Sequence, residues 1–138
     1  MGLLAVPVVT IGCLGLASIL NQLDFILAVP IAVSTVFLVS FGVTLRPGTR
    51  PMVERFARLQ EPDLIPEKQV WCRLWTKIWC VFFVLNAIAA GVLGWLAPLE
   101  WWALYTGLIS YLLTALVFGV ELLLRLQKFP KANQQGGA

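Results

Sequence analysis

The chain has 138 residues, of which 59% are hydrophobic and 12% are charged, and its formal net charge is +3. Soluble domains are about 45–50% apolar and about 25% charged, so this composition excludes a soluble globular protein and indicates a small integral membrane protein. The chain has no histidine, which excludes Ser-His-Asp and Cys-His triads and the H-E-x-x-H zinc site. Three scattered cysteines do not make a four-ligand zinc site, so we predict no metal and no cofactor.

Four apolar runs are long enough to cross a membrane, since a spanning helix needs roughly 20 apolar residues. They cover about residues 2–20, 25–45, 76–97 and 101–124. No lysine or arginine precedes the first run, so we expect it to be retained and not cleaved as a signal peptide. Short turns join the first run to the second and the third to the fourth, which makes each pair antiparallel. We therefore predict an all-α fold, a four-helix bundle of two transmembrane hairpins forming a single domain over residues 1–138.

The basic residues all fall on one side of these runs. Seven lie between residues 46 and 77 and three lie after the fourth run, whereas the two short turns carry Asp24 and Glu100. The positive-inside rule then places the central loop and both termini in the cytoplasm. The tail, residues 127–138, is polar and rich in glycine, and we predict that it is disordered.

The central loop, about residues 46–75, contains a predicted interfacial helix. Pro51 suits the first position of a helix, and apolar residues recur at helical spacing from Met52 to Leu59. A short amphipathic helix with a basic face fits a membrane interface. A second helix is predicted to begin near Pro66 and to continue into the third run.

Charged residues of the loop and of the fourth run form the candidate binding set. A guanidinium group presents a planar fork of donors that suits phosphate. Two alternatives are open, namely specific binding of a protein partner or an anionic lipid, and general attraction to anionic lipid of roughly 1 kcal/mol per basic residue. Glu54 also suits an i,i+4 pair with Arg58. The set comprises Arg46, Arg50, Glu54, Arg55, Arg58, Arg73, Glu121 and Arg125.

Aromatic residues gather where the third and fourth runs meet the membrane surfaces. Trp71, Trp75 and Trp79 follow one another at a spacing of four residues and therefore share a helix face. They are typical of an interfacial aromatic belt, and the alternative is one wall of a lipid groove. The matching belt at the other surface is predicted to comprise Trp101, Trp102 and Tyr105.

Several polar side chains lie inside the predicted spans, namely Asn86, Tyr105, Tyr111 and Glu121. An amide within the membrane usually hydrogen-bonds to a neighbouring helix, and contact with a ligand is the alternative for Asn86. Glu121 lies about one turn inside the end of the fourth run. An ionisable residue there is a functional candidate, and the alternative is an ion pair with Arg125 or with an arginine of the loop.

The segment from Arg46 to Leu59, the following Glu61-Pro-Asp-Leu and the run that begins Trp101-Trp-Ala-Leu-Tyr resemble a family of small bacterial inner-membrane proteins. The later Glu121 and Arg125 fit the same pattern, and the resemblance covers about residues 40–125. Members of that family resemble products of gene clusters for aryl polyene and xanthomonadin-type pigments, which also encode fatty-acid-synthase-like enzymes. The resemblance implies the bacterial inner membrane and the assembly, acylation or export of a polyene lipid. It implies no catalytic residues.

Three functions remain open on these grounds. The favoured one is a non-catalytic accessory protein that docks or supports enzymes of aryl-polyene or fatty-acid-type lipid biosynthesis. The second is a small transporter or flippase for a lipid-like or hydrophobic substrate, and the third is an enzyme acting on a lipid. The expected partners are membrane lipids, a biosynthetic enzyme or acyltransferase, and a second copy of the chain. Nucleic acid is not expected, because the basic residues lie beside membrane spans.

Overall fold

The computed structural model describes residues 8, 11–12, 15, 19 and 22–130. Its elements, in chain order, are α2 (Gln22–Val43), α3 (Met52–Gln60), α4 (Pro66–Leu96), α5 (Leu99–Leu104), the π-helix η1 (Tyr105–Ile109) and α6 (Ser110–Lys128). The described part of the chain is all-helical, as predicted. Most of the predicted first span, residues 2–20, and the tail beyond residue 130 lie outside the described residues, so the fourth helix of the bundle stays a prediction.

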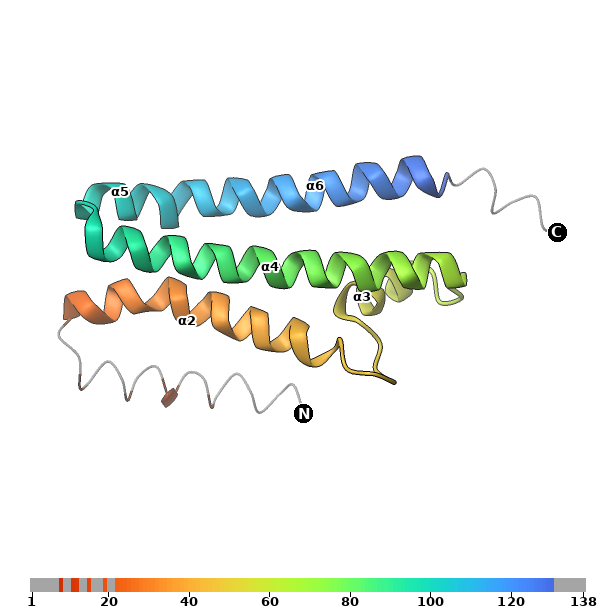
Figure 1. The fold of residues 1–138 in the computed structure, drawn as a ribbon, viewed down its shortest axis with the longest axis horizontal. Helices are drawn as coiled ribbons and strands as arrows, with labels where there is room; N and C mark the ends of the chain where they lie inside the picture. Colours follow the sequence, from red (N-terminus) through yellow and green to blue (C-terminus); the bar gives the residue numbers. More distant parts are fainter. Residues whose placement is uncertain (1–7, 9–10, 13–14, 16–18, 20–21, 131–138) are drawn as a thin grey trace.

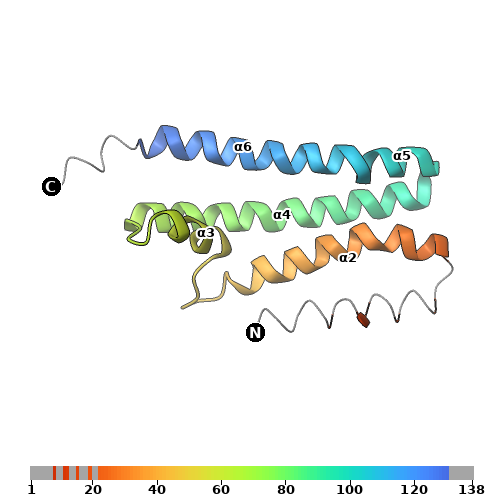
Figure 2. The same cartoon turned by 180° about the vertical axis from the view of Figure 1, so that it is seen from behind.

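Three helical stretches are long and apolar enough to cross a membrane. They are α2, α4 and the continuous stretch Leu99–Lys128, which supports a membrane protein. The three lie side by side in one layer with α4 in the middle, and the short α3 lies beside one end of α4 (Figures 1 and 2). We call this end, where α3 and Lys128 lie, the basic end.

Aromatic rings join α2 to α4. The ring of Phe83 lies 5.3 Å, between centroids, from each of Phe37 and Phe41. The ring of Trp79 lies 5.7 Å from Phe83 and 6.4 Å from Phe41. Aromatic pairs at these separations attract one another beyond the burial of their area. The backbones of α2 and α4 therefore approach closely, whereas α6 stands farther from α4.

Two predicted boundaries differ from the structure. The helix expected near Pro66 does begin there, so the loop ends at Ile65 and the stretch 66–75 is helical. Proline suits this first position, because its missing N–H needs no partner there. Likewise α6 continues to Lys128, so residues 127–128 belong to a helix and not to the tail. Cations in the last turn favour this longer helix, since they interact with its negative end.

The interfacial helix α3 is anchored by hydroxyl groups from other elements. A helix start leaves backbone N–H groups without partners, and the preceding Pro51 offers no capping side chain. The Met52 N–H donates to Thr44 Oγ1 at 3.0 Å, and the Val53 N–H donates to Thr76 Oγ1 at 3.3 Å. Thr44 follows α2 and Thr76 belongs to α4. The two threonines therefore hold α3 against the ends of both helices.

Trp102 does not lie in an exposed aromatic belt. Its side chain is 7% exposed, whereas the neighbouring Trp101 is 61% exposed. A Cβ added at Gly94 would lie 3.4 Å from the Trp102 Cδ1 atom, so the indole ring lies against α4 at Gly94. Tyr105 also departs from the predicted belt, because it hydrogen-bonds to Asn86 of α4.

Candidate functional site

A cavity of about 770 Å³ is bordered by all three long helices, and we call it the groove. It forms because α6 stands away from α4 while α2 packs closely on it. Five residues of α3 between Val53 and Gln60 border its basic end. Most of the lining is apolar, and the aromatic part of it comprises Phe37, Phe41, Trp79, Phe82, Phe83, Tyr111 and Phe118, together with Phe56 of α3.

Asn86 is the centre of a hydrogen-bond network that we call the asparagine hub. Its Nδ2 donates to Ser34 Oγ of α2 at 3.1 Å. Its Oδ1 accepts two hydrogen bonds of 2.9 Å, from the Tyr105 hydroxyl and from Ser110 Oγ. The predicted hydrogen bond from Asn86 to a neighbouring helix is therefore confirmed, and it extends to both neighbours.

The π-helix η1 explains how two hydroxyl groups reach the same amide oxygen. Tyr105 and Ser110 are five residues apart, which in a regular α-helix places side chains about 140° apart. A π-helix repeats between residues i and i+5, so the two side chains face the same side. The extra residue of η1 thereby directs both hydroxyls at Asn86.

The hub lies well inside the length of α4. Asn86 is ten residues from the end of α4 at Leu96, which corresponds to about 15 Å along the helix. The hydrocarbon core of a membrane is about 30 Å thick, so a membrane surface at Leu96 would place the hub at half its depth. Glu121 lies eleven residues beyond Ser110 on α6, about 16 Å closer to the basic end. The groove contains both polar regions and continues about one helical turn beyond the hub, where Val29, Pro30 and Thr106 line it.

Glu121 and Arg125 form the polar region at the basic end of the groove. Glu121 is only 4% exposed, and its Oε1 lies 3.7 Å from Arg125 Nε. This confirms the predicted i,i+4 pair. The indole N–H of Trp71 also donates to Glu121 Oε1, at 3.4 Å, which the sequence did not predict. The carboxylate is therefore buried with two partners from two helices.

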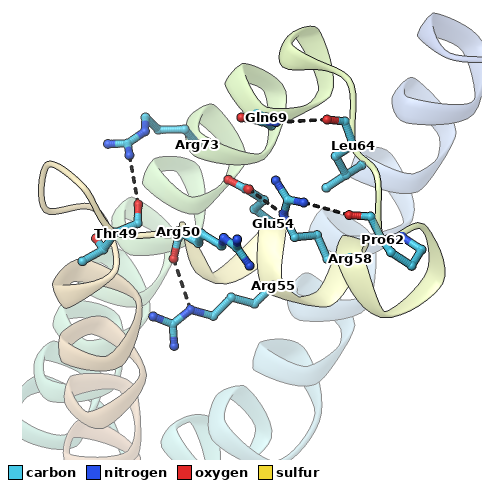
Figure 3. A network of polar contacts seen from close by, with 9 residues as sticks. All are labelled: Thr49, Arg50, Glu54, Arg55, Arg58, Pro62, Leu64, Gln69 and Arg73. Carbon is cyan, nitrogen blue, oxygen red and sulfur yellow. Dashed lines mark hydrogen bonds and ion pairs between the residues drawn. The ribbon is translucent and has the colours of Figure 1, made fainter.

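Arg58 of α3 and Arg73 of α4 bond to other groups at the basic end (Figure 3). Arg58 donates to Glu54 Oε1 and to the Pro62 carbonyl, both at 2.8 Å, and the predicted pair is confirmed. Arg73 donates to the carbonyls of Leu45 and Thr49 at 3.1 and 3.2 Å. These two arginines therefore hold the loop together.

Three other arginines, Arg46, Arg50 and Arg55, are exposed. Arg55 uses its Nε to reach the Arg50 carbonyl at 3.2 Å. No side-chain hydrogen bond or ion pair of Arg46 or Arg50 is found within residues 22–130. Of the predicted arginine set, Arg46 and Arg50 thus have all their side-chain donors available to an external anion.

The three tryptophans that were predicted to share one face of α4 have separate surroundings. Trp71 lies beside Glu121, and its ring is 5.8 Å from that of Trp75, which is buried. Trp79 lines the groove. Trp79 therefore forms part of a groove wall, which was the alternative to an interfacial aromatic belt. The buried Trp75 belongs neither to an exposed belt nor to the groove lining.

Comparison with known proteins adds no family. No protein-family model, no curated protein and no solved structure matches this chain. The resemblance to small inner-membrane proteins of pigment clusters therefore stays a prediction.

Sequence reasoning missed four hydroxyl-bearing residues, Ser34, Thr44, Thr76 and Ser110, that complete the hub and anchor α3. Serine and threonine in a span can bond to their own helix, as Thr35 does with the Ile31 carbonyl at 2.8 Å. Nothing in a single sequence separates such a residue from one that bonds to a neighbouring helix.

Proposed function

We propose that this chain is a non-catalytic accessory membrane protein that holds a single-chain, lipid-like molecule for enzymes of lipid biosynthesis. The observation that carries the proposal is the groove, an apolar cavity with hydrogen-bonding groups at the hub and at its basic end. Its volume of about 770 Å³ lies within the range of about 300–1,000 Å³ that ligand sites occupy. Such sites are mostly apolar, with a few polar groups that fix the orientation of the ligand.

The position of the groove favours a molecule that enters from one leaflet. The groove reaches from about one turn beyond the hub to the basic end, where residues of α3 border it. A chain lying in it would extend along α6 from Ser110 to Glu121, over about 16 Å. Its head would then lie at the membrane surface beside α3 and the loop, within reach of a soluble enzyme.

The exposed arginines support the accessory part of the proposal. Arg46 and Arg50 lie in the segment between α2 and α3, at the same end as the mouth of the groove. Each basic residue close to an anionic surface contributes roughly 1 kcal/mol. An acidic enzyme surface or anionic headgroups would therefore be held where the ligand's head emerges. We propose that the enzymes served belong to aryl-polyene or fatty-acid-type synthesis, as the family resemblance implies.

The test compares two tryptophan substitutions on α2. Val33 lines the groove, whereas Val39 is an exposed residue of the same helix that does not line it. The full chain in lipid nanodiscs would be titrated with cis-parinaric acid, a fluorescent octadecanoid, and the probe would be displaced with octadecanoate. We expect Val33→Trp to weaken binding at least tenfold, because the indole fills the groove, and Val39→Trp to leave it unchanged. Equal affinities of the two variants, or no saturable binding to the wild type, would overturn the proposal.

A further inference from the structure

Tyr111 carries a hydroxyl group without a partner at the middle of the membrane. It follows Ser110 of the hub, lines the groove and is 71% exposed. Within the part of the chain that the structure describes, its hydroxyl makes no hydrogen bond. Tyrosine in membrane proteins is enriched at the interface, where water and headgroups satisfy its hydroxyl. In the hydrocarbon core no such partner exists, so this hydroxyl is available to a molecule in the groove.

The asparagine hub also has hydrogen atoms left to donate. Asn86 has two N–H groups, and Ser34, Tyr105 and Ser110 each have one O–H. Three of these five hydrogens form the three hydrogen bonds of the hub. Two are therefore left to donate, whichever way the amide group of Asn86 is turned. Three of the hub's four members, Ser34, Asn86 and Ser110, line the groove.

The other hydroxyls that line the groove are already used within their own helix. Thr106 Oγ1 donates to the Trp102 carbonyl at 2.9 Å, and Thr114 Oγ1 donates to the Ser110 carbonyl at 2.8 Å. Among the hydroxyl groups that line the groove, those left to donate are therefore at Tyr111 and in the asparagine hub. A group that only accepts hydrogen bonds is the complement of such a site, and a carbonyl oxygen is such a group.

We infer that the molecule held in the groove carries a carbonyl-type oxygen within its apolar chain, which accepts hydrogen bonds from Tyr111 and the asparagine hub at the middle of the membrane. The inference rests on the proposed function and names the chemistry of its ligand. With the head of the molecule near Glu121 and this oxygen near Ser110, the two are about 16 Å apart along α6. An extended chain covers about 3.6 Å in three bonds, so the oxygen lies roughly thirteen bonds from the head.

A protein helix fits the same donors less well than a lipid does. The backbone carbonyls of a transmembrane helix are already bonded within that helix. A keto or ester oxygen in a lipid chain has no internal partner and gains one in the groove. We therefore assign the site to a lipid.

Two variants that each remove one hydroxyl group make the test. Tyr111→Phe removes the hydroxyl of a groove-lining residue that bonds to nothing described. Thr35→Val removes a hydroxyl that donates to the Ile31 carbonyl of its own helix, and Thr35 neither lines the groove nor belongs to the hub. The probes are octadecanoate, an oxo-octadecanoate with its keto group roughly thirteen bonds from the carboxylate, and an isomer with the keto group next to the carboxylate. Each would displace cis-parinaric acid from the full chain in nanodiscs.

We expect the wild type to prefer the distal keto acid to octadecanoate by about tenfold, the effect of one well-formed hydrogen bond. Tyr111→Phe should reduce this preference to about threefold or less, and Thr35→Val should keep it. Equal binding of the two keto isomers, no preference in the wild type, or an unchanged preference in Tyr111→Phe would overturn the inference. In each of these cases octadecanoate still binds and is still blocked by Val33→Trp. Loss of that blocking is instead the failure of the proposed function, so the two failures are distinguishable.

Discussion

The loop at the basic end and the groove use their polar residues in opposite ways. Around α3, Arg58, Arg73, Thr44 and Thr76 each bond to another part of the chain. In the groove, Tyr111 has no such partner among the described residues, and the hub keeps two hydrogens that it does not use. Polar residues inside a membrane are costly and are usually satisfied. Assembly of the fold thus explains the polar residues of the loop, whereas those of the groove agree with the ligand that we propose.

The packing of the helices shows the same contrast. Aromatic rings hold α2 against α4 at ring separations of 5.3 to 6.4 Å. Polar contacts join α6 and η1 to α4 at two places, the hub and the bond between Trp71 and Glu121. A helix held at separate points leaves room between them, and this room is the groove.

The largest expected effect tests whether the polar residues of the loop serve assembly. Glu54 is 5% exposed and depends on Arg58 for its charge partner. Arg58→Met leaves a buried carboxylate without that partner, and we expect the free energy of unfolding to fall by about 3 kcal/mol. Arg55→Met is the matched control on the same helix, because Arg55 is exposed and bonds to one carbonyl. Unfolding of both variants in nanodiscs measures the difference, and equal stabilities would show that the Glu54–Arg58 pair is dispensable.

The spans, the interfacial helix and the two i,i+4 pairs were predictable, because each depends on residues close together in the sequence. The apolar runs identified α2 and α4, and a spacing of four residues identified Glu54–Arg58 and Glu121–Arg125. The hub was only half predictable. Asn86 is conspicuous in an apolar run, but its partners depend on how three helices pack and on the extra residue of η1.

The surroundings of Trp102 could not be predicted from the sequence either. Its position beside a turn is typical of an interfacial tryptophan, and the neighbouring Trp101 is exposed. Trp102 is instead buried and lies against Gly94 of α4, which comes eight positions earlier in the chain. A pattern read along the sequence does not reveal such a contact, because it forms only after α5 turns back onto α4.

A smaller effect is expected from removing the hub. Asn86→Leu eliminates three interhelical hydrogen bonds, and such bonds contribute on average about 0.6 kcal/mol each, so the free energy of unfolding should fall by roughly 2 kcal/mol. Thr114→Val is the control, because it alters a groove-lining residue whose hydroxyl bonds only to its own helix. If the two variants lost the same stability in an equilibrium unfolding experiment, the hub would not be what holds α6 to α4.

The smallest effect concerns the anchor of α3. Thr76 is fully buried, and its hydroxyl accepts from the Val53 N–H. Thr76→Val keeps the shape of the side chain but leaves that N–H without an acceptor, which costs about 1 kcal/mol. Because the loss is local, we expect the Val53 amide to exchange its hydrogen about fivefold faster while amides in the middle of α4 keep their rates. Thr35→Val, which removes a hydroxyl bonded only within α2, should leave Val53 unaffected. Unchanged exchange at Val53 in Thr76→Val would mean that Thr76 does not anchor α3, and the contrast between the loop and the groove would then rest on the arginines and Thr44.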